Sequence, residues 1–190
     1  MKMNSKKLLA LTESAVMIAL SFVLNLIVIW QMPLGGKVTL VSMLPVMLVG
    51  IRHGVKWGFA TTCAYAVLQT ALSFAKVLGW GLTPTIFIVC ILFDYFLPYA
   101  LLGITSFFRR GGKVTVIIGI ALALVARFIC HFITGATIWA NWVEDSAGAI
   151  FSYSLVYNGQ YMLPEIVFTL IVAVVLMSVP HAKKLLAPVQ

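Results

Sequence analysis

The sequence predicts an all-α membrane protein with six transmembrane helices. Of its 190 residues, 62% are hydrophobic and only 9% are charged, and the mean hydropathy is +1.08. A soluble domain carries roughly a quarter charged residues, so this chain has too little polar surface to face water on all sides. The 13 Lys and Arg residues lie between apolar stretches, which argues against the basic surface of a soluble nucleic-acid-binding protein.

Six apolar stretches give the expected helices, since a bilayer core is crossed by about 20 apolar residues in helical form. They cover residues 9–30, 38–51, 57–76, 85–108, 114–139 and 155–180. The second stretch is short, so it could instead only dip into the membrane. No connection between stretches is long enough to hold another domain, and we expect one six-helix domain over residues 1–190.

The basic residues favour six crossings with both termini in the cytoplasm. Lys and Arg gather in cytoplasmic connections of membrane proteins. With six crossings, only Lys37 and Lys76 face outside, whereas a non-crossing second stretch would separate Arg52 and Lys56 from the N-terminal lysines. The inner side then receives Lys2, Lys6, Lys7, Arg52, Lys56, Arg109, Arg110, Lys113, Lys183 and Lys184.

Five ionisable side chains fall inside the predicted helices: Glu13, Asp94, Arg127, His131 and Glu165. Such residues are costly in lipid and are therefore functional candidates. Glu13 lies near the inner end of its helix, where it can reach water. Arg127 and His131 are four residues apart and share a helix face. Arg127 could form a buried ion pair with Asp94 or Glu165, and His131 could be a hydrogen-bonded core residue or a ligand contact.

Aromatic and amide side chains gather near the predicted outer ends of the last two helices. Trp139, Trp142 and Tyr153 precede a stripe in which Asn158, Tyr161 and Glu165 recur at helical spacing. Tryptophan and tyrosine also collect at membrane surfaces for lipid reasons, but lipid would not select an amide and a carboxylate. Aromatic faces and a carboxylate together suit a flat, nitrogen-rich cation, which indicates an outward-facing pocket.

Two kinds of chemistry receive little support from the sequence. Gly112-Lys113 is followed by Val114 and lacks the preceding glycine of a phosphate-binding loop, so we expect no ATP hydrolysis by that route. Asp94, His131 and Glu165 could in principle converge as metal ligands or as acid and base in an intramembrane enzyme, but no paired-histidine motif is present. The three cysteines, Cys63, Cys90 and Cys130, lie in apolar segments, and we expect no disulfide.

Several motifs, in order and spacing, resemble the thiamine-specific substrate-binding subunits of energy-coupling factor (ECF) transporters, the ThiT or YuaJ family. The resemblance covers residues 12 to about 175. The segments that carry it are residues 32–40 (MPLGGKVTL), 43–45 (MLP), 52–54 (RHG), 94–95 (DY), 131–135 (HFITG) with Trp139, 153–158 (YSLVYN) and 161–165 (YMLPE).

The resemblance implies a six-helix S-component that captures extracellular thiamine at a bacterial cytoplasmic membrane. It would dock on a transmembrane coupling subunit and two cytoplasmic ATPase subunits, which agrees with the missing phosphate-binding loop. The chain itself would then be no enzyme and would need no cofactor or metal. An S-component for another vitamin, such as riboflavin or a pyrimidine precursor, is the nearest alternative.

The resemblance also implies roles for single residues. The matching positions for holding the aminopyrimidine ring are Asp94, Tyr95 and His131, and Trp139 matches a tryptophan that stacks on the ligand. Tyr153 and Asn158 match residues that line the thiazolium and hydroxyethyl end, and Trp142 and Glu165 extend the same pocket. Relatives carry Glu where this chain has Asp94, which a shift of helix or ligand would have to accommodate.

Three further expectations follow from the family pattern. A first-loop tryptophan of some relatives has no match at Gly35 or Gly36, and Trp30 or Trp80 would replace it. Ala15 and Ala19 would face the coupling subunit, because small residues four apart let helices approach closely, although they could equally pack within the chain. Movement of the outer loops would close the pocket, with Gly135, Gly148 and Gly159 as candidate hinges.

Overall fold

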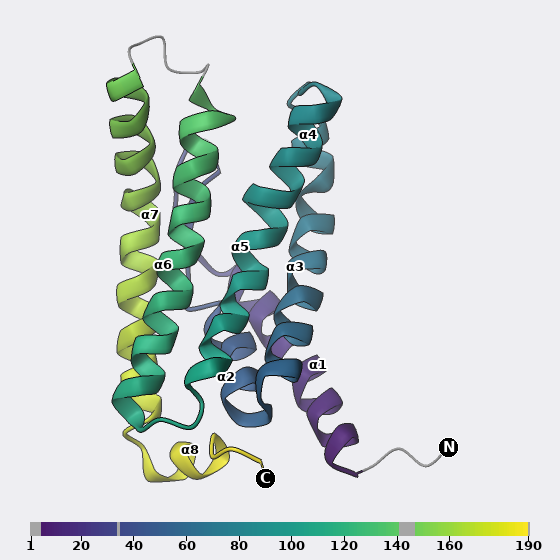
Figure 1. Cartoon of the computed structure of the whole chain (residues 1–190), viewed down its shortest axis with the longest axis vertical. Coiled ribbons are helices and arrows are strands. Elements are labelled where there is room, and N and C mark those ends of the chain that lie inside the picture. The colour runs from purple at the N-terminus through teal and green to yellow at the C-terminus, as the bar shows by residue number, and fades with distance from the viewer. Residues whose placement is uncertain (1–4, 34, 141–146, 190) are drawn as a thin grey trace.

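The computed structural model describes residues 5–33, 35–140 and 147–189, and these form an elongated helical bundle (Figure 1). The described part of the chain begins and ends at the same end of the bundle, which we call the inner end; the opposite end is the outer end. The long elements are α1 (Ser5–Leu26), α3 (Val55–Leu78), the composite segment Pro84–Phe108, α6 (Lys113–Thr137) and α7 (Ala147–Leu176).

Four helices in the described part of the chain are long and apolar enough to cross a membrane: Ser5–Leu26, Pro84–Phe108, Lys113–Thr137 and Gly148–Leu176. Helix α3 has 24 residues, but buried polar residues such as Thr61, Thr62 and Gln69 lower its hydropathy. The expectation of six full-length spanning helices is therefore not confirmed, although the chain still passes back and forth between the two ends.

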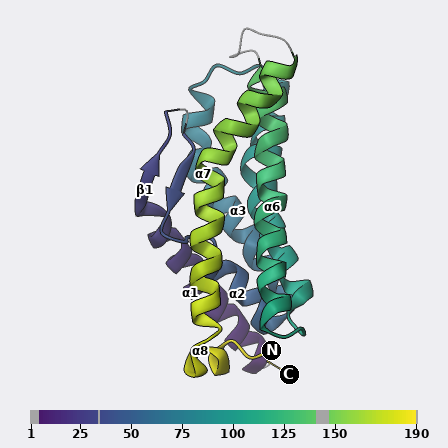
Figure 2. The same ribbon diagram turned by 90° about the vertical axis from the view of Figure 1, so that its left-hand side faces the viewer.

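The region predicted as the end of the first helix and the start of the second is a β-hairpin. Strand β1 (Val28–Gln31) pairs antiparallel with β2 (Lys37–Thr39), and the hairpin lies beside α7 (Figure 2). The β-branched run at residues 27–29 favours extended backbone over helix. Gly35 has φ of 108°, a conformation that glycine adopts without strain, and it permits the turn.

The second predicted helix is shorter than expected. Helix α2 spans Leu44–His53, so its 10 residues extend about 15 Å, half the thickness of a bilayer core. Every residue from Leu44 to Ile51 is buried. The segment descends from the outer half as strand β2 and reaches the inner end only as α2.

The composite segment changes helix type along its length. Helix α4 (Pro84–Cys90) is capped by the Thr83 hydroxyl, and it leads into the π-helical turn η1 (Ile91–Phe96). Helix α5 (Leu97–Ala100) and the 3₁₀-helix η2 (Leu101–Phe108) complete it. Pro98 has no N–H and would crowd the carbonyl four residues earlier, that of Asp94, so a widened turn is expected here.

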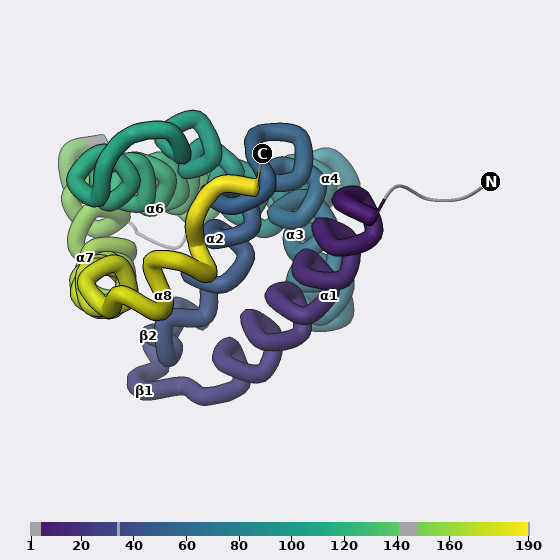
Figure 3. The backbone as a smooth tube through the Cα atoms, turned by 90° about the horizontal axis from the view of Figure 1, so that it is seen from below, coloured from purple at the N-terminus to yellow at the C-terminus, as the bar shows by residue number. Residues whose placement is uncertain are grey.

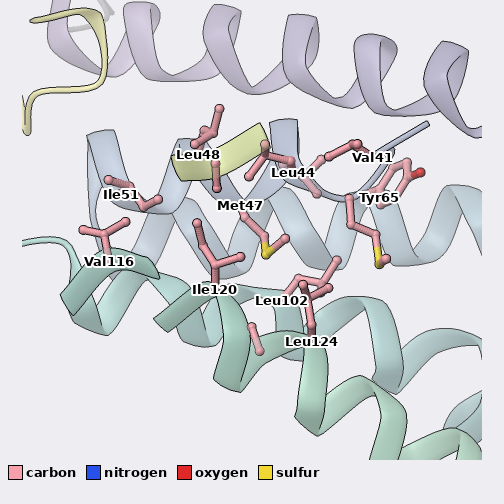
Figure 4. Close-up of a cluster of buried hydrophobic side chains, with 14 residues drawn as sticks. Val41, Leu44, Met47, Leu48, Ile51, Tyr65, Leu102, Val116, Ile120 and Leu124 are labelled. Carbon is pink, nitrogen blue, oxygen red and sulfur yellow. The ribbon is translucent and has the colours of Figure 1, made fainter. Parts of the chain in front are cut away.

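The apolar core fills the inner half, around α2 (Figure 4). Gly50 and Gly58 allow α2, α3 and η2 to touch, because a Cβ atom on Gly50 would lie 2.7 Å from Cβ of Ser106. A short helix that was not predicted, α8 (Pro180–Leu185), runs across the inner end beneath α2 (Figure 3). The core residues are Val41, Met43, Leu44, Val46, Met47, Leu48, Ile51, Tyr65, Leu102, Val116, Ile120, Ala123, Leu124 and Ala173.

Candidate ligand-binding site

The outer half encloses a cavity of about 420 Å³, a size typical of small-molecule sites. Its walls are the hairpin, the outer parts of α3, α6 and α7, and the π-helical turn η1. The lining residues are Gln31, Pro33, Gly35, Gly36, Lys37, Gln69, Leu72, Ser73, Lys76, Trp80, Asp94, Tyr95, Tyr99, Arg127, His131, Thr134, Gly135, Trp139, Tyr153, Ser154, Tyr157, Asn158 and Tyr161.

Asp94 is the carboxylate of this cavity, and three side chains orient it. One oxygen, Oδ1, lies 2.7 Å from Nδ1 of His131 and accepts from the Thr134 hydroxyl at 2.8 Å. Among the described residues, the other oxygen, Oδ2, accepts only a long contact of 3.4 Å from the Trp139 indole N–H. A carboxylate oxygen can accept more than one hydrogen bond, so Oδ2 has capacity for a ligand donor.

His131 offers a complementary acceptor. With Nδ1–H directed at a carboxylate, the neutral ring carries its lone pair on Nε2. That Nε2 atom is buried and has no hydrogen-bond partner among the described residues. Asp94 and His131 can therefore bind a ligand group that presents a donor to each, such as an amino-substituted nitrogen ring.

Aromatic rings form the walls on both sides of the carboxylate. The rings of Trp80 and Trp139 meet edge to face with centroids 4.8 Å apart, and Tyr95 lies 6.5 Å from Trp80. On α7, the rings of Tyr153 and Tyr157 stack at 5.9 Å. These faces can hold a flat ring and stabilise a cation.

Asn158 joins α6 to α7 rather than pointing free into the cavity. Its amide nitrogen donates to the carbonyls of His131 at 3.1 Å and Ser154 at 2.9 Å, and its oxygen accepts from the Tyr161 hydroxyl at 2.7 Å. Gly135 makes this contact possible, since a Cβ atom there would overlap the Ser154 hydroxyl and lie 2.9 Å from Nδ2 of Asn158. The network fixes the backbone around His131.

Three cations share the cavity with the single carboxylate. Lys37 comes from β2 and Lys76 from α3, while the guanidinium of Arg127 lies 4.1 Å from the ring centre of Tyr99. Burial lowers the pKa of Lys37, with a further contribution from Arg127 and Lys76. Among the described residues Arg127 forms no ion pair, and its Nε and Nη1 atoms have no hydrogen-bond partner. The ion pair of Arg127 with Asp94 or Glu165, one of the two interpretations that the sequence left open, is therefore not found there.

Glu165 lies below the cavity and holds the hairpin. Its carboxylate accepts from the backbone N–H of Thr39 at 2.6 Å and from the Thr39 hydroxyl at 2.7 Å. It borders a separate space of about 20 Å³, with Lys37 and Arg127 on its walls. The structure does not bring Glu165 together with Asp94 and His131, and the described residues contain no metal-binding group of three His, Cys, Asp or Glu side chains.

Comparison with known proteins decides between the functional classes. Residues 11–185 match the model of the thiamine transporter protein family (Thia_YuaJ). The chain belongs to this thiamine transporter family. It is 29% identical over 198 residues to the thiamine transporter ThiT of Bacillus subtilis (strain 168), covering 95% of this chain and 97% of that protein.

The fold is also similar to that of a solved structure. ThiT from Listeria monocytogenes superposes with a TM-score of 0.71 at 20% sequence identity, covering 97% of this chain and all of the other. The family consists of transporters, so the intramembrane enzyme is not favoured.

Seven of the residues that the sequence predicts for the binding site do line the cavity. They are Trp80, Asp94, Tyr95, His131, Trp139, Tyr153 and Asn158. Trp142 lies outside the described residues, and Trp30 sits exposed on β1, away from the cavity. The sequence analysis did not predict Gln69, although a glutamine in an otherwise apolar helix is a detectable signal. It also did not predict Tyr99, and no feature of the surrounding sequence distinguishes that residue.

Proposed function

We propose that this transporter captures extracellular thiamine in the outer cavity, as the substrate-binding subunit of an ECF-type importer. The observation that carries the proposal is the Asp94–His131 pair inside an aromatic cavity. The exocyclic amino group of the pyrimidine donates to Oδ2 of Asp94, and an N–H or O–H group of the ligand meets Nε2 of His131. Trp139 stacks on the ligand, and Tyr95 completes this wall.

The remaining lining residues suit the other end of thiamine. The positive thiazolium ring lies toward the tyrosines of α7, Tyr153 and Tyr157, because Lys37, Lys76 and Arg127 repel it elsewhere. The hydroxyethyl group can then accept a hydrogen bond from a basic side chain. In this arrangement Asn158 acts by holding Tyr161 and the His131 backbone, and Glu165 acts by holding the hairpin.

The shorter carboxylate of this chain has a structural counterpart. Asp94 stands on the π-helical turn η1, whose widened backbone changes the direction in which the side chain leaves the helix. We infer that this turn brings Asp94 within reach of the ligand where relatives use the longer Glu.

The partners and the orientation belong to the same proposal. Ala15 and Ala19 are exposed on α1, on a face that no other described element covers, and they form the surface for the coupling subunit. ATP hydrolysis is supplied by two cytoplasmic ATPase subunits. The described chain begins and ends at the inner end, where Arg109 donates to the carbonyls of Arg52 and Val189, and we assign this end to the cytoplasm of a bacterial cell.

Tryptophan fluorescence of the detergent-purified chain tests the proposal, because Trp80 and Trp139 border the cavity. The chain is titrated with thiamine and, separately, with riboflavin. Saturable quenching by thiamine alone is the expected result. A response only to riboflavin would keep the transporter architecture and reject the substrate, and no response to either vitamin would reject ligand capture by the isolated chain.

A further inference from the structure

A line of polar contacts joins the cavity to α1. Gln69 of α3 lines the cavity, and its amide oxygen accepts from Nδ2 of Asn25 on α1 at 3.3 Å. Its amide nitrogen donates to the Tyr65 hydroxyl at 2.7 Å, and that hydroxyl donates to the backbone carbonyl of Ser21 at 3.3 Å. We call Asn25, Gln69, Tyr65 and Ser21 the polar seam.

The polar seam makes up much of the contact between α1 and the rest of the bundle. The buried residues of α1 are Ala10, Ser14, Ser21 and Asn25, none of them a large apolar side chain. One turn further in, the Thr61 hydroxyl donates to that of Ser14 at 2.9 Å. Helix α1 lies at the edge of the bundle, with α2 and α3 on one side only (Figure 3). Small residues let membrane helices approach closely, and polar side chains add hydrogen bonds between them.

The two ends of α1 are held differently. At the inner end, Glu13 contacts Arg52 at 2.7 Å and His53 at 2.6 Å. At the outer end, the contacts are the polar seam and a hydrogen bond from Nζ of Lys37 to the Asn25 carbonyl at 3.3 Å. Lys37 and Gln69 both line the cavity, so the outer attachment of α1 uses groups that a ligand can reach, whereas the inner attachment does not.

The hydrogen bonding of the polar seam is also incomplete. The Ser21 hydroxyl is fully buried and has no hydrogen-bond partner among the described residues. Nearly all buried hydroxyl groups in proteins find a partner, so the contact between α1 and α3 at Ser21 leaves a hydrogen-bonding group unused. Elements with two discrete arrangements are what couples distant sites.

We propose that Gln69 is a positioning residue that transmits occupation of the cavity to the outer half of α1. This inference rests on the proposed function, since thiamine is taken as the ligand. A ligand beside Gln69 fixes its amide, the amide holds Asn25, and α1 settles into one arrangement. In the empty protein, of the described residues only Asn25 and Tyr65 hold the amide, the first through a long contact of 3.3 Å, and α1 samples a wider range of positions. As a result, the exposed face of α1 with Ala15 and Ala19 has a single position relative to the rest of the bundle only when the cavity is filled.

Distance measurements between spin labels test the proposal. Labels are attached to Val23→Cys on α1 and Val167→Cys on α7, both exposed, after Cys63, Cys90 and Cys130 have been replaced by Ala. Thiamine at saturation, verified by fluorescence on the same sample, is expected to narrow the distance distribution to a single peak. In Gln69→Met, which keeps the side-chain length without an amide, this narrowing is lost at equal occupancy.

Two further variants separate transmission from binding. Asn25→Leu removes the other side of the contact without touching the cavity wall and is expected to lose the narrowing as Gln69→Met does. Val67→Ala, on the exposed face of the same helix and outside the cavity lining, keeps it. A ligand response that survives in both seam variants, or a distribution in the parent protein that thiamine leaves unchanged, overturns the proposal. Failure of thiamine to quench the fluorescence overturns the proposed function as well.

Discussion

The inner and outer halves of this transporter are built from the same helices but differ in what fills the space between them. The inner half is filled by apolar side chains around α2, and Val46, Ile120 and Leu124 there have no exposed surface. The outer half holds a polar, aromatic cavity in which buried groups such as Nε2 of His131 lack partners. The contrast indicates that stability resides mainly in the inner half, which leaves the outer half free to keep unsatisfied groups for a ligand.

A deletion in the inner half is expected to have the largest effect. Ile120→Ala leaves a void in the core and should lower the free energy of unfolding by about 2–5 kcal/mol. The thiamine Kd of the folded fraction should stay unchanged, because Ile120 belongs to the apolar core and does not line the cavity. Thermal unfolding in detergent and fluorescence titration measure the two quantities. A Kd that worsened together with stability would show that the halves are not independent.

The converse change in the outer half is Asp94→Asn. It removes a charge-assisted hydrogen bond worth about 1.5–3 kcal/mol, so thiamine affinity should fall by roughly 10- to 150-fold. Unfolding should change less than in Ile120→Ala, since the buried negative charge disappears together with its contacts. Titration calorimetry gives the affinity. An unchanged Kd would remove Asp94 from the binding site.

Trp139→Ala tests the aromatic wall. Loss of one stacking face should weaken binding by about 0.5–2 kcal/mol, a smaller change than at Asp94. Trp30→Ala is the matched control, because Trp30 is 51% exposed and does not line the cavity. Equal effects in the two variants would mean that the lost tryptophan acts through the membrane surface rather than through the ligand.

Thr39→Val should give the smallest effect and lies at the boundary between the halves. It removes the hydroxyl that donates a hydrogen bond to Glu165 but keeps the hydrogen bond from the backbone N–H. The hairpin therefore loses one of these two hydrogen bonds to α7 and keeps the other. We expect a loss of about 1 kcal/mol in unfolding free energy. Proteolysis rates at the hairpin, with and without thiamine, report the loosening. Faster cleavage that thiamine does not slow would separate the hairpin from ligand binding.

The sequence alone predicted the long helices better than the segment between them. The run at residues 27–30 is apolar enough to read as the end of a membrane helix, and only its β-branching points to a strand. The burial of α2 on all sides likewise reads as a membrane span, because both environments select apolar residues. Its 10-residue length follows from the partners that enclose it, which local sequence does not encode.

The candidate site was predicted where the side chains are costly in lipid. Asp94 and His131 stood out as ionisable residues inside helices, and the structure places Oδ1 of Asp94 2.7 Å from Nδ1 of His131. Glu165 stood out for the same reason and shares a helix stripe with Asn158, yet it reaches Thr39 instead of the cavity. Helical spacing gives the face of a residue but not the neighbour that the face meets.

The π-helical turn η1 makes the position of Asp94 depend on chain length as well as on residue type. Such a turn holds one residue more than the α-helical turn it replaces. Deleting a residue such as Leu92 would let η1 close into ordinary α-helix, with the helical segments on either side kept nearly in phase. The cavity would keep its carboxylate, but Asp94 would leave the helix in a different direction. Insertions and deletions in η1 therefore offer a route to new substrates that keeps the identity of every ligand-contacting residue.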